Sequence, residues 1–319
     1  MKMKRLIMGS MALISGLCLA ACGSTKTNND TLKVGIIQYA EHDALTSARE
    51  GFLAALEEAG YKQGENLTVD YQNAQGDQAN LQTMVDQLAR QNDVNFAIAT
   101  PAAQALINVD SETPSVFTAV TDPVEAGLVD SLKSPGGNMT GSVDANDVEG
   151  QIDMLLKVLP DAKTVGIFYN SSEVNSEVQA KQAQKALEAV GRKVVIKTAT
   201  SSNDVQQVIT SLAGQVDAIY FPTDNTVAST ASTIGEILKE KKVPAMGSDG
   251  AVLEAVLFTY GVDYYAIGQQ AGQLAAQILD GKEPADLAVK TPDTGAVAVN
   301  KEMAQALGID EITITSIAP

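Results

Sequence analysis

Residues 33–38 (KVGIIQ) form a short apolar run, and residues 44–59 (ALTSAREGFLAALEEA) follow it with apolar side chains at helical spacing. The pattern of a buried strand followed by an amphipathic helix then recurs along the chain. Further short apolar runs lie at 67–71, 95–99 and 115–120, and helical stretches lie between them at 78–90 and 101–109. Strands that alternate with helices predict a parallel sheet with helices on both faces, which is the α/β fold class.

The same order of segments restarts at Lys163, which indicates an internal repeat. Residues 34–36 (VGI) match residues 165–167 (VGI), and residues 55–60 (ALEEAG) match residues 186–191 (ALEAVG). Both matches have the same offset of 131 residues, so the first strand and helix align without a gap. Chance similarity is the alternative, since all such strand–helix units share Val, Gly and Ala. We predict two related lobes, each a doubly wound parallel sheet.

The composition of the 319 residues is that of a globular protein, with 45% hydrophobic and 19% charged residues. The length suits two domains of roughly 150 residues each. The net charge of −17 repels phosphate backbones and argues against nucleic-acid binding. The two cysteines are Cys18 and Cys22, and the one histidine is His42, so the folded body offers neither a disulfide nor a Cys-based zinc site. We expect no metal ion and no cofactor.

The first 22 residues have the pattern of an export signal. Lys2, Lys4 and Arg5 precede an uncharged apolar run of about 16 residues at 6–21, shorter than the ~20 residues that a membrane-spanning helix needs. A single membrane anchor helix is the alternative. The run ends in Leu19-Ala20-Ala21-Cys22-Gly23, which resembles the lipobox of bacterial lipoproteins, in which the cysteine is acylated. We expect a body joined by a polar tether at 23–31 to a lipid anchor on Cys22, at the extracytoplasmic face of the cell membrane.

Polar residues follow the predicted strands in both halves of the chain. In open parallel sheets, ligands bind beyond the carboxyl ends of the strands, where helix N-termini present free N–H groups. Helix N-capping is the alternative role for each Thr, Ser or Asp at these positions. The candidate ligand-binding residues are Tyr39, His42, Thr100, Pro101, Ala102, Thr118, Thr121, Asp122, Tyr169, Asn170, Thr223, Asp224, Ser248 and Asp249.

The chemistry of these candidates suits an α-amino acid. Thr100 precedes a helix that starts at Pro101, where the helix dipole favours a carboxylate, and Asp224 and Asp249 suit an ammonium group. Tyr39, His42 and Tyr169 are placed to enclose a side chain, which we expect to be aromatic. The three arginines of the body, Arg49, Arg90 and Arg192, lie in predicted helices away from the strand ends, which argues against a bidentate guanidinium site.

Catalytic motifs are missing from the sequence. No GxGxxG, GxxxxGK[ST] or GxSxG pattern occurs at a strand–helix junction. A hydrolase that uses His42 and an Asp is an alternative, but no nucleophile accompanies this histidine. We expect a binding protein and not an enzyme.

Several segments together resemble the tryptophan/tyrosine-type branch of the ABC-transporter substrate-binding lipoproteins, which have the type I periplasmic-binding-protein fold. The segments are the lipobox, residues 34–42 (VGIIQYAEH), 121–124 (TDPV), 135–138 (PGGN), 222–225 (PTDN), 261–265 (GVDYY), and Val299-Asn300 with 304–308 (AQALG). The resemblance implies a monomer that closes two lobes around an amino acid and docks on a permease driven by a cytoplasmic ATPase. A sugar or nucleoside receptor of the same fold is the alternative.

The family resemblance also implies lobes built from separate pieces of the chain. After the signal at 1–22 and the tether at 23–31, the N-terminal lobe is expected to comprise 32–143 and 263–290. The C-terminal lobe is expected to comprise 144–262 and 291–319.

Overall fold

The computed structural model describes residues 31–292 and 295–317, which belong to one compact unit of the chain, Thr31–Pro319. The predicted signal, lipobox and most of the tether lie outside the described residues. No helix in the described ranges combines the length and the apolar character that a membrane span requires.

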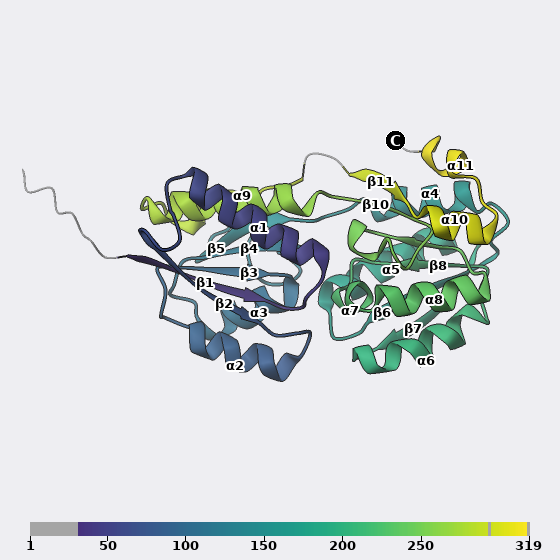
Figure 1. Ribbon diagram of the computed structural model, residues 1–319, viewed down its shortest axis with the longest axis horizontal. Coiled ribbons are helices and arrows are strands. Elements are labelled where there is room, and N and C mark those ends of the chain that lie inside the picture. Colours follow the sequence, from purple (N-terminus) through teal and green to yellow (C-terminus); the bar gives the residue numbers. More distant parts are fainter. Residues whose placement is uncertain (1–30, 293–294, 318–319) are drawn as a thin grey trace, which may run out of the picture. The chain divides into compact units, whose positions relative to one another are not determined.

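The first sheet is parallel throughout and has the strand order β2-β1-β3-β4-β5 (Figure 1). Its central strands β1, β3 and β4 are apolar and almost wholly buried, because helices cover both faces. Its strands are β1 Leu32–Gln38, β2 Leu67–Asn73, β3 Val94–Ile98, β4 Ser115–Val120 and β5 Met139–Val143. The helices that pack on it are α1 Asp43–Glu58, α2 Gln78–Leu88, α3 Thr100–Val109 and α9 Tyr264–Leu279.

The second sheet has the order β11-β10-β9-β8-β6-β7, in which only β11 runs antiparallel to its neighbour. Its strands are β6 Thr164–Asn170, β7 Lys193–Ala199, β8 Ala218–Phe221, β9 Ala245–Gly247, β10 Phe258–Gly261 and β11 Ala296–Val299. Its helices are α4 Val148–Val158, α5 Val174–Ala189, α6 Ser202–Ala213, α7 Asn225–Ser229, α8 Ala231–Lys241, α10 Lys301–Leu307 and α11 Glu311–Thr315. Two short 3₁₀ helices complete the elements, η1 Gly250–Val252 and η2 Pro284–Asp286.

The two sheets repeat one topology. If β6 is matched to β1, the order β7-β6-β8-β9-β10 is the order β2-β1-β3-β4-β5. Each sheet also has its own apolar core. The prediction of two doubly wound parallel-sheet lobes is therefore confirmed. The antiparallel strand β11 comes from the tail of the chain, and α9 packs on the first sheet although it follows β10 of the second.

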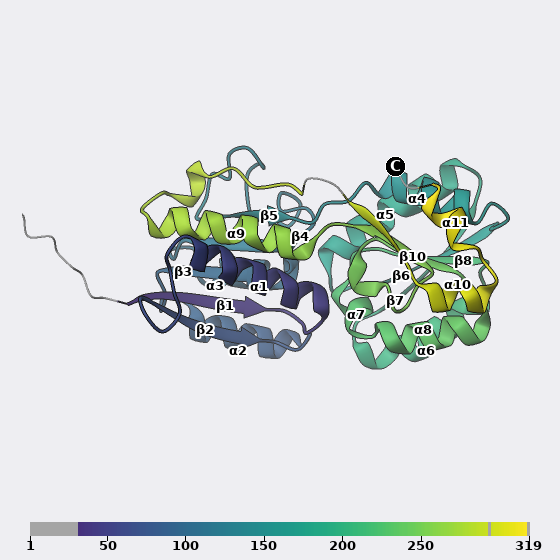
Figure 2. The same ribbon diagram turned by 45° about the horizontal axis from the view of Figure 1, so that its top comes forward.

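Helices α1 and α9 pack side by side on one face of the first sheet (Figure 2). A Cβ atom at Gly268 would lie 2.1 Å from the carbonyl oxygen of Ala48, and one at Gly272 would lie 2.5 Å from that of Phe52. Both glycines are needed because any side chain would push the helices apart. The contact advances by four residues on each helix, so the helices are parallel and their N-termini lie at the same end.

The structure corrects three local expectations. Helix α2 ends at Leu88, and Arg90 and Arg192 lie outside helices, in the turns that precede β3 and β7. Arg49 lies in α1 as expected, but its guanidinium Nη1 donates to Gln38 Oε1 at the end of β1, at 2.7 Å. Strand β5 was not predicted, because Thr140, Gly141 and Ser142 interrupt its apolar run.

Candidate functional site

A small cavity lies at the carboxyl ends of strands from both sheets. The space in it that a water-sized sphere can occupy is about 10 Å³, roughly what one water molecule needs, so the lining side chains nearly fill the cavity in this conformation. Its lining consists of His42, Leu45, Ala119, Asp144, Asn175, Thr223, Asp224, Asn225, Ala228, Asp249, Ala251 and Tyr264. Residues that follow β1 and β5 of the first sheet, with Ala119 near the end of β4, thus meet residues that follow β6, β8 and β9 of the second.

Three buried aspartates, Asp144, Asp224 and Asp249, line the cavity. Burial raises the pKa of Asp249 to about 7, and the charges of Asp144 and Asp224 add to the increase. Burial likewise raises the pKa values of Asp144 and Asp224. Burial disfavours the charged form of each carboxyl group. A positive group in the cavity would stabilise that charged form, so the cavity favours a ligand with a positive group.

The three aspartates differ in how many hydrogen bonds their carboxyl groups accept from the protein. Asp224 accepts from three backbone N–H groups, those of Asn170, Thr226 and Val227, at 2.7–2.9 Å. Asp249 caps η1 through one bond from the Ala251 N–H at 2.8 Å. Asp144 accepts from the Tyr264 hydroxyl at 3.1 Å through Oδ2, and its Oδ1 has no hydrogen-bond partner within the described residues. Asp144 and Asp249 therefore have more free acceptor capacity than Asp224.

The N-termini of two long helices also reach the cavity. Helix α1 begins directly after His42, and α9 begins at Tyr264, so both place their first turns at the cavity. Each helix has 16 residues, and the parallel packing of the two adds their dipoles at this end. The N-cap of α1 makes no side-chain hydrogen bond, so its free N–H groups and positive dipole end favour an anion such as a carboxylate, whereas at α9 Asp263 already accepts from the Ala266 N–H.

A hydrogen-bonded chain of three side chains joins the two sheets at the cavity. His42 Nε2 lies 3.2 Å from Asn225 Oδ1, and Asn225 Nδ2 donates to Glu173 Oε2 at 2.6 Å. Glu173 is 0% exposed, and burial together with the charge of Asp224 raises its pKa to about 8. Burial lowers the pKa of His42, which keeps its imidazole neutral.

The structure brings four of the predicted residues together in the cavity lining: His42, Thr223, Asp224 and Asp249. Two other predicted residues lie outside the lining but form hydrogen bonds with it. Ser248 Oγ is bonded to Thr223 Oγ1 at 2.7 Å, and Asn170 donates its backbone N–H to Asp224. The strand-end rule thus identifies the loops after β1, β8 and β9.

The other predicted residues lie outside the cavity lining: Tyr39, Thr100, Pro101, Ala102, Thr118, Thr121, Asp122 and Tyr169. Tyr39 is buried and donates to the Gly76 carbonyl at 3.3 Å, Thr118 is bonded to Ser142 Oγ at 2.8 Å, and Asp122 accepts from the backbone N–H groups of Val124 and Glu125 in a turn. The anion-favouring helix ends at the cavity are those of α1 and α9, and not that of α3, which begins at Thr100.

Eight lining residues were missed: Leu45, Ala119, Asp144, Asn175, Asn225, Ala228, Ala251 and Tyr264. Asp144 follows β5 directly, so the strand-end rule would have found it once that strand was recognised. Ala119 reaches the cavity because the register of β4 shifts beside it, where its φ is +55°. A non-glycine residue in this conformation carries no sequence signal.

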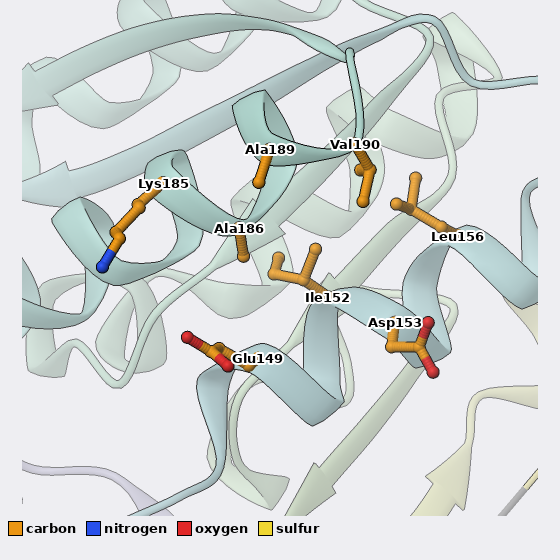
Figure 3. A pocket seen from close by; sticks show the side chains of 8 residues that line it. All are labelled: Glu149, Ile152, Asp153, Leu156, Lys185, Ala186, Ala189 and Val190. Atoms are coloured by element: carbon orange, nitrogen blue, oxygen red, sulfur yellow. The ribbon is translucent and has the colours of Figure 1, made fainter.

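A second hollow lies between α4 and α5, away from the strand ends (Figure 3). Its floor is apolar, with Ile152, Leu156 and Ala186, and Glu149, Asp153 and Lys185 stand around it. The side chains do not converge on a buried polar group, in contrast to the cavity at the strand ends. The cavity is therefore the candidate ligand site.

Comparison with known proteins gives a consistent picture. The family model described as ABC transporter substrate binding protein matches residues 33–315. A curated relative, the tyrosine-binding protein of Clostridioides difficile, is 38% identical over 295 residues, which cover 92% of this chain and 86% of the relative.

Two solved structures add a conformational comparison. The structure of an ABC domain in complex with L-Trp from Streptococcus pneumonia is 36% identical, covers 91% of this chain and 99% of its own, and has a TM-score of 0.85. The ligand-free, open structure of a substrate-binding protein with adhesive properties from Clostridium difficile is 41% identical, covers 88% and 96%, and has a TM-score of 0.66. The backbone described here is thus more similar to the L-Trp complex, despite the lower sequence identity.

Proposed function

Because the chain belongs to the ABC transporter substrate-binding protein family, we propose that its strand-end cavity captures an aromatic amino acid, tryptophan, tyrosine or phenylalanine, for an ABC importer. The observation that carries the proposal is that buried carboxyl groups and helix N-termini line the same cavity. The N-termini of α1 and α9 suit the ligand carboxylate, and Asp144 and Asp249 suit its ammonium group. The ligand class is supported by relatives that are a tyrosine-binding protein and an L-Trp complex.

The partners of this function are a permease and its cytoplasmic ATPase, to which the chain delivers its ligand as a monomer. The ligand is released chemically unchanged, as expected for a member of a substrate-binding protein family. A sugar or nucleoside receptor of the same fold is the competing function. Buried carboxylates also bind sugar hydroxyls, but a neutral sugar would leave the helix N-termini of α1 and α9 without an anion.

A thermal-shift panel separates the two ligand classes. L-Trp, L-Tyr and L-Phe are tested beside myo-inositol, glucose and adenosine at equal concentrations. A ligand present at 100 times its Kd stabilises the folded protein by about 2.7 kcal/mol, which corresponds to a rise of several degrees in Tm. We expect this rise with at least one aromatic amino acid and none with the sugars or the nucleoside. A rise with a sugar or nucleoside alone would refute the amino-acid proposal.

We also propose that the protein is held at the extracytoplasmic face of the cell membrane by acyl groups on Cys22. The proposal rests on the lipobox Leu19-Ala20-Ala21-Cys22-Gly23. Cys22→Ser removes the acceptor for the acyl chains, whose burial in the bilayer contributes about 0.8 kcal/mol per CH₂ group. The variant is expected in the soluble fraction or the medium, as measured by fractionation and mass spectrometry. Cys18→Ser is the matched control and should stay with the membrane. A Cys22→Ser protein that remains membrane-bound with lipid attached would refute the anchor.

A further inference from the structure

The hydrogen bonds around Asn225 determine which way its side-chain amide is oriented. Glu173 Oε2 accepts from both the backbone N–H of Asn225, at 3.1 Å, and its side-chain Nδ2, at 2.6 Å. Glu173 Oε1 faces two further donors, the N–H and the hydroxyl of Thr226, each at 3.3 Å. The two backbone N–H groups can only donate, so each oxygen of Glu173 accepts one of them. Asn225 Nδ2 is a further donor to Oε2, which leaves the Asn225 carbonyl oxygen facing away from Glu173.

This orientation determines the protonation of His42 as well. The Asn225 carbonyl oxygen lies 3.2 Å from His42 Nε2 and can only accept. His42 Nε2 must therefore carry the proton. In a neutral imidazole the other nitrogen, Nδ1, is then an unprotonated acceptor. Nδ1 is buried and has no hydrogen-bond partner within the described residues, although His42 belongs to the cavity lining.

We propose that Glu173, acting through Asn225, holds His42 in the Nε2–H tautomer, so that Nδ1 accepts a hydrogen bond from an N–H or O–H group of the bound ligand. Glu173 and Asn225 are positioning residues, and His42 is the residue that selects the ligand. The inference rests on the proposed function, because it concerns the same cavity. It requires that the ligand present a donor at His42, which in an aromatic amino acid is the ammonium, the indole N–H or the phenol O–H.

The surroundings of His42 support a neutral ring. Burial lowers the pKa of His42 more than the neighbouring carboxylates Glu41 and Asp43 raise it. A charged imidazolium would carry a proton on both nitrogens and would repel an ammonium group. The neutral Nε2–H tautomer leaves Nδ1 unprotonated and does not repel an ammonium group. Nδ1 can therefore accept a hydrogen bond from a ligand donor that would otherwise be buried without a partner.

Nuclear magnetic resonance can test the tautomer directly because His42 is the only histidine in the chain. In the ¹⁵N-labelled protein saturated with L-Trp, the single imidazole is expected to show a protonated Nε2 and an unprotonated Nδ1. Correlation of ¹⁵N with the ring carbon-bound protons distinguishes the two tautomers. A protonated Nδ1 in this complex would overturn the proposal.

Two substitutions of Glu173 test the positioning role by calorimetry with L-Trp. Glu173→Gln keeps a carbonyl oxygen for the Asn225 NH₂ group, whereas Glu173→Met removes every acceptor. We expect Glu173→Gln to bind L-Trp within about threefold of wild type, and Glu173→Met to bind about 5- to 150-fold more weakly with the Nδ1–H tautomer populated. Equal losses of affinity in both variants, or retention of the Nε2–H tautomer in Glu173→Met, would contradict the relay.

A substitution of His42 tests the acceptor itself. Gln at position 42 can still donate to Asn225 from the position of Nε2 but has no acceptor at the position of Nδ1. We expect His42→Gln to weaken L-Trp binding about 5- to 150-fold, and the exposed control Asn203→Ala to bind like wild type. Wild-type affinity in His42→Gln would refute the acceptor role. If L-Trp, L-Tyr and L-Phe all fail to bind the wild-type protein, the proposed function itself is wrong, which is a different outcome from any of these.

Discussion

Asp249→Asn is expected to weaken the binding of an aromatic amino acid by about 10- to 150-fold. Asp249 lines the cavity and is 2% exposed. Its carboxyl group accepts one backbone hydrogen bond, from the Ala251 N–H. A charge-assisted hydrogen bond to the ligand ammonium is worth about 1.5–3 kcal/mol, which gives this range. Isothermal titration calorimetry with L-Trp, L-Tyr and L-Phe measures the loss.

Asp310→Asn is the matched control for the capping role. Asp310 Oδ1 accepts from the N–H two residues ahead, that of Ile312 at 2.9 Å, just as Asp249 Oδ1 accepts from that of Ala251 at 2.8 Å, but Asp310 is exposed and lies outside the cavity. The control should bind like wild type. If Asp249→Asn also binds like wild type, Asp249 is only a helix cap. Asp224 is a less sharp probe, because its three backbone N–H partners make its replacement a change in the fold as well.

Ligand affinity is expected to rise with pH between about pH 5 and pH 7, by up to about tenfold per pH unit. Burial raises the pKa of Asp249 to about 7, so this carboxyl group is protonated in the ligand-free protein over most of that range. An ammonium group binds the carboxylate form, so binding must release the proton, and one released proton gives at most a tenfold change per unit. Above about pH 7 the slope should fall towards zero.

Calorimetry in buffers of different ionisation enthalpy counts the released protons at each pH. We expect close to one proton at pH 6 for the wild-type protein and fewer for Asp249→Asn. Proton uptake, or an affinity independent of pH in this range, would contradict the assignment of Asp249 to the ammonium group.

The same pKa shift has an opposite consequence for the ligand-free protein. An acid whose folded pKa lies above its unfolded value binds more protons when folded, so its contribution to the free energy of unfolding falls as pH rises from about 4 to about 7. Asp249→Asn removes this contribution. The variant should therefore gain stability relative to wild type as pH rises through this window, as measured by urea unfolding without ligand.

Most of the fold could be predicted from the sequence, because most strands of the two sheets are short apolar runs that can be recognised without knowledge of distant residues. Residues 34–37 (VGII) and 116–120 (VFTAV) are mostly apolar runs, and the matching of 34–36 with 165–167 indicated the repeat that the equal strand orders now confirm. Strand β5 was not predicted, because Gly141 and two hydroxyl side chains leave no apolar run among its five residues. Its burial is supplied by tertiary packing, which a local pattern does not contain.

The candidate site was predicted in part for a similar reason. Thr223, Asp224 and Asp249 are polar residues at strand ends, and that rule is local. Whether a strand end reaches the cavity depends on the bulge at Ala119 and on the return of α9 to the first sheet, both of which involve residues far apart in sequence. Thr100 and Asp122 obey the same local rule but lie outside the cavity lining, so polarity at a strand end does not by itself place a residue in the cavity.

Native mass spectrometry of the freshly purified protein, followed by denaturation and identification of the released molecule, tests most directly whether the cavity binds an aromatic amino acid. We predict that one tryptophan, tyrosine or phenylalanine is released per chain from the wild-type protein, and that its occupancy is much lower in Asp249→Asn. A sugar, an inositol or a nucleoside in the same position would contradict the proposed function.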